Sequence, residues 1–138
     1  MTKKLFTISV FLIIAGAALF VYAGFTMQYF TAKANSDGIL IEWKTADEAG
    51  SPYFELERSA STTENFIYIK SISTTGNNSY YSYEDNSLNN KLGNSSIYYY
   101  RLKIYKPDGN FFYSGNVSVV YTVSGIKDTW GSIKAIFR

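Results

Sequence analysis

The chain has 138 residues, of which 18% are aromatic and 17% charged, and its formal net charge is +2. That charge comes from Lys3 and Lys4, because the remaining basic and acidic residues cancel. The balance argues against a nucleic-acid-binding protein, which needs a net basic face. If the first 23 residues form a targeting segment, the 115 that remain are enough for one compact domain and too few for two.

The sequence contains neither cysteine nor histidine. Their absence removes thiolate metal ligands, thiol nucleophiles, the commonest general base and the commonest metal ligand. We therefore expect no catalytic residue, no metal site and no cofactor. A lipid anchor on an N-terminal cysteine is excluded for the same reason.

The N-terminal segment, residues 1–23, is typical of export. Lys3 and Lys4 precede an uncharged apolar run from Leu5 to Ala23, and the small residue at its end predicts a signal peptide cut before Gly24. The run is also long enough to cross a bilayer as a helix, so an uncleaved anchor stays open. In both cases we expect an extracytoplasmic protein that is either secreted or held at the cell surface.

The body of the chain shows a hydrophobic period of two, which indicates β-strands rather than helices. Successive runs are rich in Val, Ile, Tyr and Phe and are separated by turn residues. The predicted strands, in chain order, are Gln28–Lys33, Ile39–Lys44, Tyr53–Arg58, Phe66–Ser71, Tyr80–Glu84, Ile97–Tyr105 and Phe111–Thr122.

Clusters of Gly, Asn, Asp, Ser and Pro mark the connections between these strands. Asn86–Ser96 predicts one long connection, and Lys106–Asn110 is a strong hairpin signal. The other predicted turns are Asn35–Gly38, Ala49–Pro52 and Thr74–Asn78.

Successive side chains of a strand point to opposite faces, so one apolar set can be buried between two sheets. Ile39, Ile41 and Trp43 share one face of the second predicted strand, and Phe54 and Leu56 one face of the third. Seven short antiparallel strands favour an all-β sandwich over residues 24–122, preceded by an N-terminal hydrophobic helix. Its predicted core in the sixth strand is Tyr98, Tyr100, Leu102 and Ile104.

Trp43, the pattern Tyr98-x-Tyr100-x-Leu102 and an upstream leucine at Leu88 or Leu92 resemble the skeleton of fibronectin type III domains. The resemblance implies an immunoglobulin-like sandwich. It also implies that Tyr98 is the corner tyrosine, whose hydroxyl ties the preceding connection to the sheet.

A narrower likeness covers roughly Met27 to Thr122 and rests on runs such as FTAKANSDGILIEWKTADE, YFELERS and YYYRLK. These runs are similar to domains of exported proteins from Bacteroidetes and related bacteria. The likeness implies a fold and an extracytoplasmic compartment. It implies no activity, because type III modules have many unrelated roles.

Glu55 and Glu57 lie two apart on one strand, so their carboxylates share a face. Paired carboxylates are the pattern that glycoside hydrolysis uses. A second interpretation is stronger, because the third and sixth strands of a type III fold are neighbours. The outward residues Arg101 and Lys103 of the sixth strand would then pair with the two glutamates across a solvated sheet face.

Asp108-Gly109-Asn110 and Asp85-Asn86 carry oxygen ligands of the kind that calcium prefers. Neither has the alternating spacing of a known calcium loop. We expect them to be turn residues.

Tyr53 and Tyr99 fall on the outward parity of their strands, and Tyr68 is a further candidate for an exposed ring. Exposed aromatic rings can anchor a protein partner or stack on a sugar. The alternative to a binding role is that these rings only cover neighbouring side chains across strands on the sheet surface. A flat aromatic strip would favour sugar binding, and scattered rings would argue against it.

The C-terminal tail, residues 123–138, departs from the strand pattern. Asp128 could cap a short helix on which Trp130, Ile133 and Phe137 form one apolar stripe. Such a stripe packs on the sandwich, contacts a membrane surface, or is recognised by another protein as an export or attachment tag.

These features favour a non-catalytic adhesion or protein-interaction module, or a subunit of a surface assembly. The alternative is a carbohydrate-binding module that uses exposed tyrosines. The expected partner is a protein or a surface polysaccharide, with membrane contact through residues 1–23 and the tail. The candidate binding residues are Tyr53, Tyr99, Trp130 and Phe137.

Overall fold

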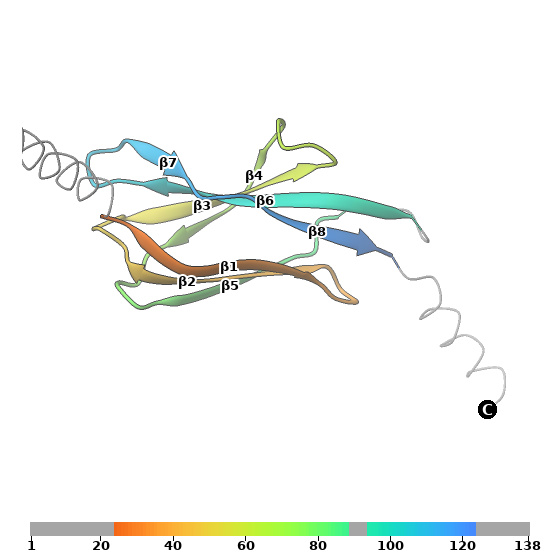
Figure 1. Ribbon diagram of the computed structural model, residues 1–138, viewed down its shortest axis with the longest axis horizontal. Helices are drawn as coiled ribbons and strands as arrows, with labels where there is room; N and C mark the ends of the chain where they lie inside the picture. The colour runs from red at the N-terminus through yellow and green to blue at the C-terminus, as the bar shows by residue number, and fades with distance from the viewer. Residues whose placement is uncertain (1–23, 89–93, 124–138) are drawn as a thin grey trace, which may run out of the picture.

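A computed structural model describes residues 24–88 and 94–123, all of them as strands, turns and loops (Figure 1). No helix within these residues is long and apolar enough to cross a membrane. The strands are β1 (Thr26–Ala34), β2 (Ile39–Asp47), β3 (Tyr53–Ala60), β4 (Ile67–Ser73), β5 (Tyr80–Asp85), β6 (Ser95–Tyr105), β7 (Phe111–Tyr113) and β8 (Val117–Thr122).

The strands form two antiparallel sheets that lie face to face (Figure 1). The smaller sheet has the order β1-β2-β5. The larger sheet has the order β4-β3-β6-β7, and β8 pairs with β6 as well. The described part of the chain is therefore an all-β sandwich, as the period-two pattern predicted.

The core lies between the two sheets and follows from the alternation of side chains. Ile39, Ile41 and Trp43 of β2 are fully buried and face Phe54 and Leu56 of β3. The indole of Trp43 stacks on a ring of β5 and meets two further rings edge-on. Burial of large apolar side chains is the main term that stabilises such a fold.

The sequence predicts seven strands, and this number is wrong for the described residues, because the predicted strand Phe111–Thr122 is two strands, β7 and β8. Both pair with the same edge of β6. Lys103 lies opposite Tyr113, and Tyr100 lies opposite Val117. Between these two pairs, β6 has two residues (101 and 102), whereas the segment that joins β7 to β8 has three (114–116). One extra residue on one of two paired strands is the geometry of a β-bulge.

A side chain holds the bulge in place. Ser114 Oγ accepts a hydrogen bond from the backbone N–H of Leu102 at 2.8 Å, and the N–H of Ser114 donates to the Leu102 carbonyl at 2.9 Å. Gly115, the next residue, has open space around its Cα. Such an interruption is not visible in the alternation of residue types.

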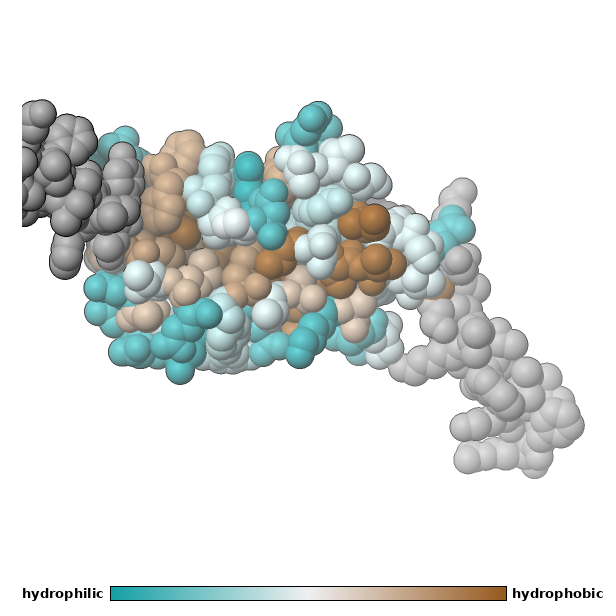
Figure 2. Space-filling model, in the orientation of Figure 1, coloured by the Kyte–Doolittle hydropathy of each residue, from teal (hydrophilic) through white to brown (hydrophobic). Residues whose placement is uncertain are grey.

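The predicted signal peptide or anchor (1–23), the predicted tail from residue 124 onward and part of the long connection (89–93) lie outside the described residues. The N-terminal hydrophobic helix predicted from the sequence lies outside them as well. The space-filling view in Figure 2 looks onto the edge of the sandwich where β1 and β8 lie and shows hydrophobic residues gathered over β8. Val120 of β8 is 58% exposed.

Candidate functional site

The outer face of the larger sheet carries an interlocked set of aromatic and basic side chains. The register of β3, β6 and β7 brings them together, because residues that face each other across strands point to the same side of a sheet. Arg101, Lys103 and Tyr105 alternate with core residues along β6. We call this set the aromatic face; it consists of Tyr53, Phe66, Arg101, Lys103, Tyr105, Phe111 and Tyr113.

Four of its rings form a continuous row. Tyr53 and Tyr105 stack with their centroids 4.4 Å apart and their planes 23° apart. Tyr105 contacts Phe111 at 5.9 Å, and Phe111 contacts Tyr113 edge-on at 5.5 Å. The row therefore runs from β3 across β6 to β7, and each ring restricts its neighbour.

Arg101 is held from three directions. Its guanidinium lies 3.7 Å from the ring centroid of Tyr113 and 4.0 Å from that of Phe66, so it sits over two rings. Its Nε donates to Glu57 Oε1 at 2.8 Å. A cation over an aromatic face and a carboxylate at its edge fix the guanidinium in one orientation.

Lys103 occupies the middle of the row. Its Nζ lies 4.1 Å from the ring centroid of Phe111 and 5.2 Å from that of Tyr105. A hydrogen bond with Tyr105 raises the pKa of Lys103, and burial together with the neighbouring Tyr105 raises the pKa of Tyr53. At neutral pH the lysine is charged and the tyrosine is neutral.

Parts of the aromatic face remain open to solvent. Phe111 is 47% exposed and Tyr113 is 43% exposed. Tyr68, which lies opposite Glu57 in the register of β3 and β4, is 58% exposed and extends the face towards the β4 edge. Exposed large rings next to an ordered arginine are the composition that protein interfaces favour.

The residues predicted as a binding surface have different places in the structure. Tyr53 belongs to the aromatic face. Tyr99 points to the same side of β6 but lies opposite Ser59 and Ser118, six residues from Tyr105, or about 20 Å along the strand. The two tyrosines therefore do not form one platform. Trp130 and Phe137 lie outside the described residues.

The residues predicted as structural core are all buried. Trp43, Tyr100 and Leu102 are fully buried, and Tyr98 is nearly so. The guanidinium of Arg58 lies 5.6 Å from the ring centroid of Tyr98. The connection that a corner tyrosine would hold includes residues 89–93, which lie outside the described residues.

The predicted ion pairing on the outer face is confirmed for Glu57, which pairs with Arg101 across β3 and β6. Glu55 lies opposite Lys103 in the same register. The Nζ of Lys103 lies over the rings of Phe111 and Tyr105, and within the described residues no ion pair joins it to Glu55. The sequence showed that these charges faced outward but not that they would be interleaved with rings.

A buried ion pair near the end of β5 was missed by the sequence analysis, which placed Asp85 in a turn. Asp85 is fully buried; its Oδ2 accepts from Arg58 Nη1 at 2.6 Å and from the Tyr100 hydroxyl at 2.7 Å. Ser87 donates to Oδ1 through both its hydroxyl and its N–H. The carboxylate thus joins the smaller sheet to β3 and β6 of the larger one.

The environment of Asp85 changes its acidity and that of Tyr100. Burial opposes ionisation of Asp85, but hydrogen bonds from Ser87, Tyr100 and Arg58 outweigh it and lower the pKa of this carboxyl. Burial and the bond to Asp85 raise the pKa of Tyr100. The signal was present in the sequence, because Arg58 shares the inward parity of Phe54 and Leu56 and a buried cation needs a partner.

The turn interpretation of Asp108-Gly109-Asn110 is confirmed. Asp108 Oδ1 accepts from the N–H of Asn110 at 2.9 Å, and Lys106 N donates to the Asn110 carbonyl at 2.7 Å. Gly109 has φ 89°, a left-handed conformation that favours glycine. Among residues 24–88 and 94–123, no cluster of three or more acidic side chains could hold a metal ion.

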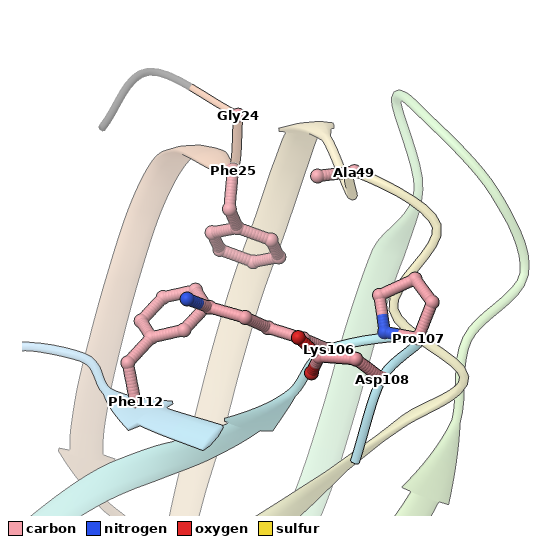
Figure 3. A pocket seen from close by; sticks show the side chains of 7 residues that line it. All are labelled: Gly24, Phe25, Ala49, Lys106, Pro107, Asp108 and Phe112. Atoms are coloured by element: carbon pink, nitrogen blue, oxygen red, sulfur yellow. The ribbon is translucent and has the colours of Figure 1, made fainter. Parts of the chain in front are cut away.

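A groove of about 640 Å³ lies at the end of the sandwich where β1 begins (Figure 3). Phe25 and Phe112 meet edge-on inside it, with centroids 5.6 Å apart. Lys106 extends towards the ring of Phe112, with its Nζ 5.7 Å from the centroid (Figure 3). The full lining is Gly24, Phe25, Ala49, Lys106, Pro107, Asp108 and Phe112.

A scan against models of known protein families and a search of curated proteins found no match to this sequence. The case for function therefore depends on the geometry described above.

Proposed function

We propose that the chain is a non-catalytic, extracytoplasmic protein-interaction module of the fibronectin type III kind, and that the aromatic face is its binding surface. The observation that carries this proposal is the ordered, partly exposed array of rings around Arg101 and Lys103.

The strand order supports the type III part of the proposal. In the constant-type immunoglobulin sandwich the fourth strand joins the sheet of the first, second and fifth strands. Here β4 pairs with β3 in the other sheet, and β3 pairs with β6, as a type III fold requires. The fully buried Trp43 in the second strand also supports the type III part of the proposal.

The composition of the aromatic face supports a protein partner. Tyrosine and arginine are enriched among the residues that contribute most to protein-protein binding. Arg101 is fixed by two rings and a carboxylate, so little side-chain entropy is lost when a partner orders the surface further. Pre-organisation of this kind increases affinity without adding contacts.

The geometry of the rings argues against a sugar platform. A sugar stacks on an open ring face, but Tyr53 and Tyr105 cover one face of each other. Cations lie over the rings of Tyr113 and Phe111. The rings therefore present edges and a few open faces rather than a flat strip.

The charges of this region balance, since Arg101 and Lys103 are matched by Glu55 and Glu57 in the register. We therefore expect partner binding to depend on ring contacts and hydrogen bonds more than on long-range attraction. Its affinity should change little with salt.

Photo-crosslinking in the producing cell tests the proposal. A benzoylphenylalanine at Tyr113 should give a discrete crosslink to a protein, whereas one at Tyr80 should not. Tyr80 is a matched control, because it is 54% exposed and lies on the smaller sheet. Equal crosslinking at both positions, or none at Tyr113, would contradict the proposal.

The carbohydrate alternative has its own test. The purified protein is exposed to a panel of polysaccharides, and any binding is compared with that of Tyr53→Ala and Tyr99→Ala. We expect no binding. Saturable binding that either substitution abolishes would replace the protein-interaction proposal with the carbohydrate one.

A further inference from the structure

The end of the sandwich at which β1 begins brings three segments together: the start of the described chain at Gly24 and Phe25, the turn after β2, and the β6–β7 turn (Figures 1 and 3). The β1–β2 turn, Asn35–Gly38, lies at the opposite end (Figure 1). The two ends can therefore be compared within one molecule.

The side chains at the first end are of the kinds found where proteins meet a bilayer surface. Phe25 and Phe112 line the groove with half-buried rings. Lys106 carries a charge at the end of an apolar stem and lies over one of these rings. Aromatic residues and lysines with this arrangement favour the headgroup layer.

Only two residues separate the N-terminal apolar run from the first strand at this end of the sandwich. The apolar run Leu5–Ala23 stops at the residue before Gly24, and β1 starts at Thr26. As a helix that run would measure about 28 Å, close to the ~30 Å hydrocarbon thickness of a bilayer. If it spans the membrane, the groove cannot lie far from the headgroups.

We propose that residues 1–23 remain attached and that this end of the sandwich rests on the outer bilayer surface, with the β6–β7 turn in the headgroup layer. The occupant of the groove is then lipid. This adds a contact to the membrane contacts expected from the sequence, and it is independent of a protein partner at the aromatic face. Lys106 and Asp108 balance, so the contact needs no anionic lipid.

Spin labels on the full chain in phosphatidylcholine nanodiscs test the proposal. The natural sequence has no cysteine, so Pro107→Cys and Ser36→Cys each give one labelling site. Both residues are exposed, one in each end turn. Collision rates with oxygen, which concentrates in lipid, and with a water-soluble nickel complex report the surroundings of each label.

We expect the label at position 107 to lose nickel accessibility and gain oxygen accessibility relative to the label at position 36. This difference should persist at high salt. Equal nickel accessibility at both positions would overturn the proposal. A loss of both accessibilities at position 107 would also overturn it, because it indicates protein rather than lipid in the groove.

The intact mass of the exported protein gives a second, independent test. A mass that includes residues 1–23 supports the proposal, and a mass that begins at Gly24 overturns it. Neither result affects the crosslinking at Tyr113, so failure here and failure of the proposed function are distinguishable.

Discussion

At the scale of single residues, this sandwich depends on side chains that link its two sheets without disulfides. Trp43 stacks on Tyr81 with centroids 5.3 Å apart and meets Phe30 and Phe54 edge-on. Asp85 joins Arg58 and Tyr100 across the sheets. The contacts of Trp43 are apolar and those of Asp85 are polar, so the two sites respond differently to substitution and to pH.

Trp43→Ala should lower the free energy of unfolding by about 3–5 kcal/mol, because it removes a fully buried ring from a close-packed core. Urea unfolding at neutral pH measures the change. Tyr68→Ala is the control and should stay within about 0.5 kcal/mol of the natural protein, since Tyr68 is 58% exposed. If Trp43→Ala has the same free energy of unfolding as the natural protein, the core described here is wrong.

Asp85→Asn should cost about 3–5 kcal/mol at neutral pH, since it leaves Arg58 buried beside a neutral group. The folded state lowers the pKa of Asp85 below its ordinary value of 3.8. Its contribution is therefore fully present above that pH and is lost as the pH falls through the folded-state pKa.

Urea unfolding of the natural protein and of Asp85→Asn at pH 7 and pH 3 measures this loss. The difference between the two proteins should narrow at pH 3. Asp37→Asn, which removes an exposed carboxylate, is the control and should stay within about 0.5 kcal/mol of the natural protein at pH 7. An equal difference at both pH values for Asp85→Asn would contradict a lowered pKa.

At the scale of elements, the alternation of residue types predicted most of the strands, because burial between two sheets imposes a period of two. Ile39, Ile41 and Trp43 are an example. The break at Ser114 was not predictable in this way, because it depends on a hydrogen bond to Leu102 in another strand. Parity alone cannot show such a partner.

The candidate site was predictable only in part, for the same reason. Parity indicated that Tyr53, Arg101 and Lys103 face outward, and it also placed Tyr99 outward. Which rings meet depends on the register of β7 against β6, and the bulge sets that register. Tyr53 therefore stacks on Tyr105 in the row of rings, whereas Tyr99 lies six residues from Tyr105 along β6 and is not part of that row.

The β1–β2 turn gives a prediction at this scale. A Cβ on Gly38 would lie 2.2 Å from the backbone oxygen of Asp85, so the turn or the end of β5 must move. Gly38→Ala should cost about 1–3 kcal/mol, as overpacked sites do. Thermal or urea unfolding measures the cost.

Gly115→Ala is the matched control, because nothing lies within 4 Å of the position that its Cβ would take. It should stay within about 0.5 kcal/mol of the natural protein. If Gly38→Ala and Gly115→Ala are equally stable, Gly38 does not lie as close to the end of β5 as described.

At the scale of the whole molecule, the last strand that the structure describes is β8, which ends at Thr122. We expect that deletion of residues 126–138 leaves the melting temperature unchanged and alters localisation or assembly. Thermal unfolding of the purified protein and fractionation of the producing cells measure the two effects. A truncated protein that fails to fold would show that the tail belongs to the core.

The central claim is that a partner covers the aromatic face in the cell. Tyr113→Cys and Tyr80→Cys place one thiol on each outer face of a chain that otherwise has none. The rate of alkylation by a water-soluble maleimide is compared between intact cells and the purified protein. A rate that falls in cells at position 113 but not at position 80 is the predicted result, and unchanged rates at both positions would contradict the claim.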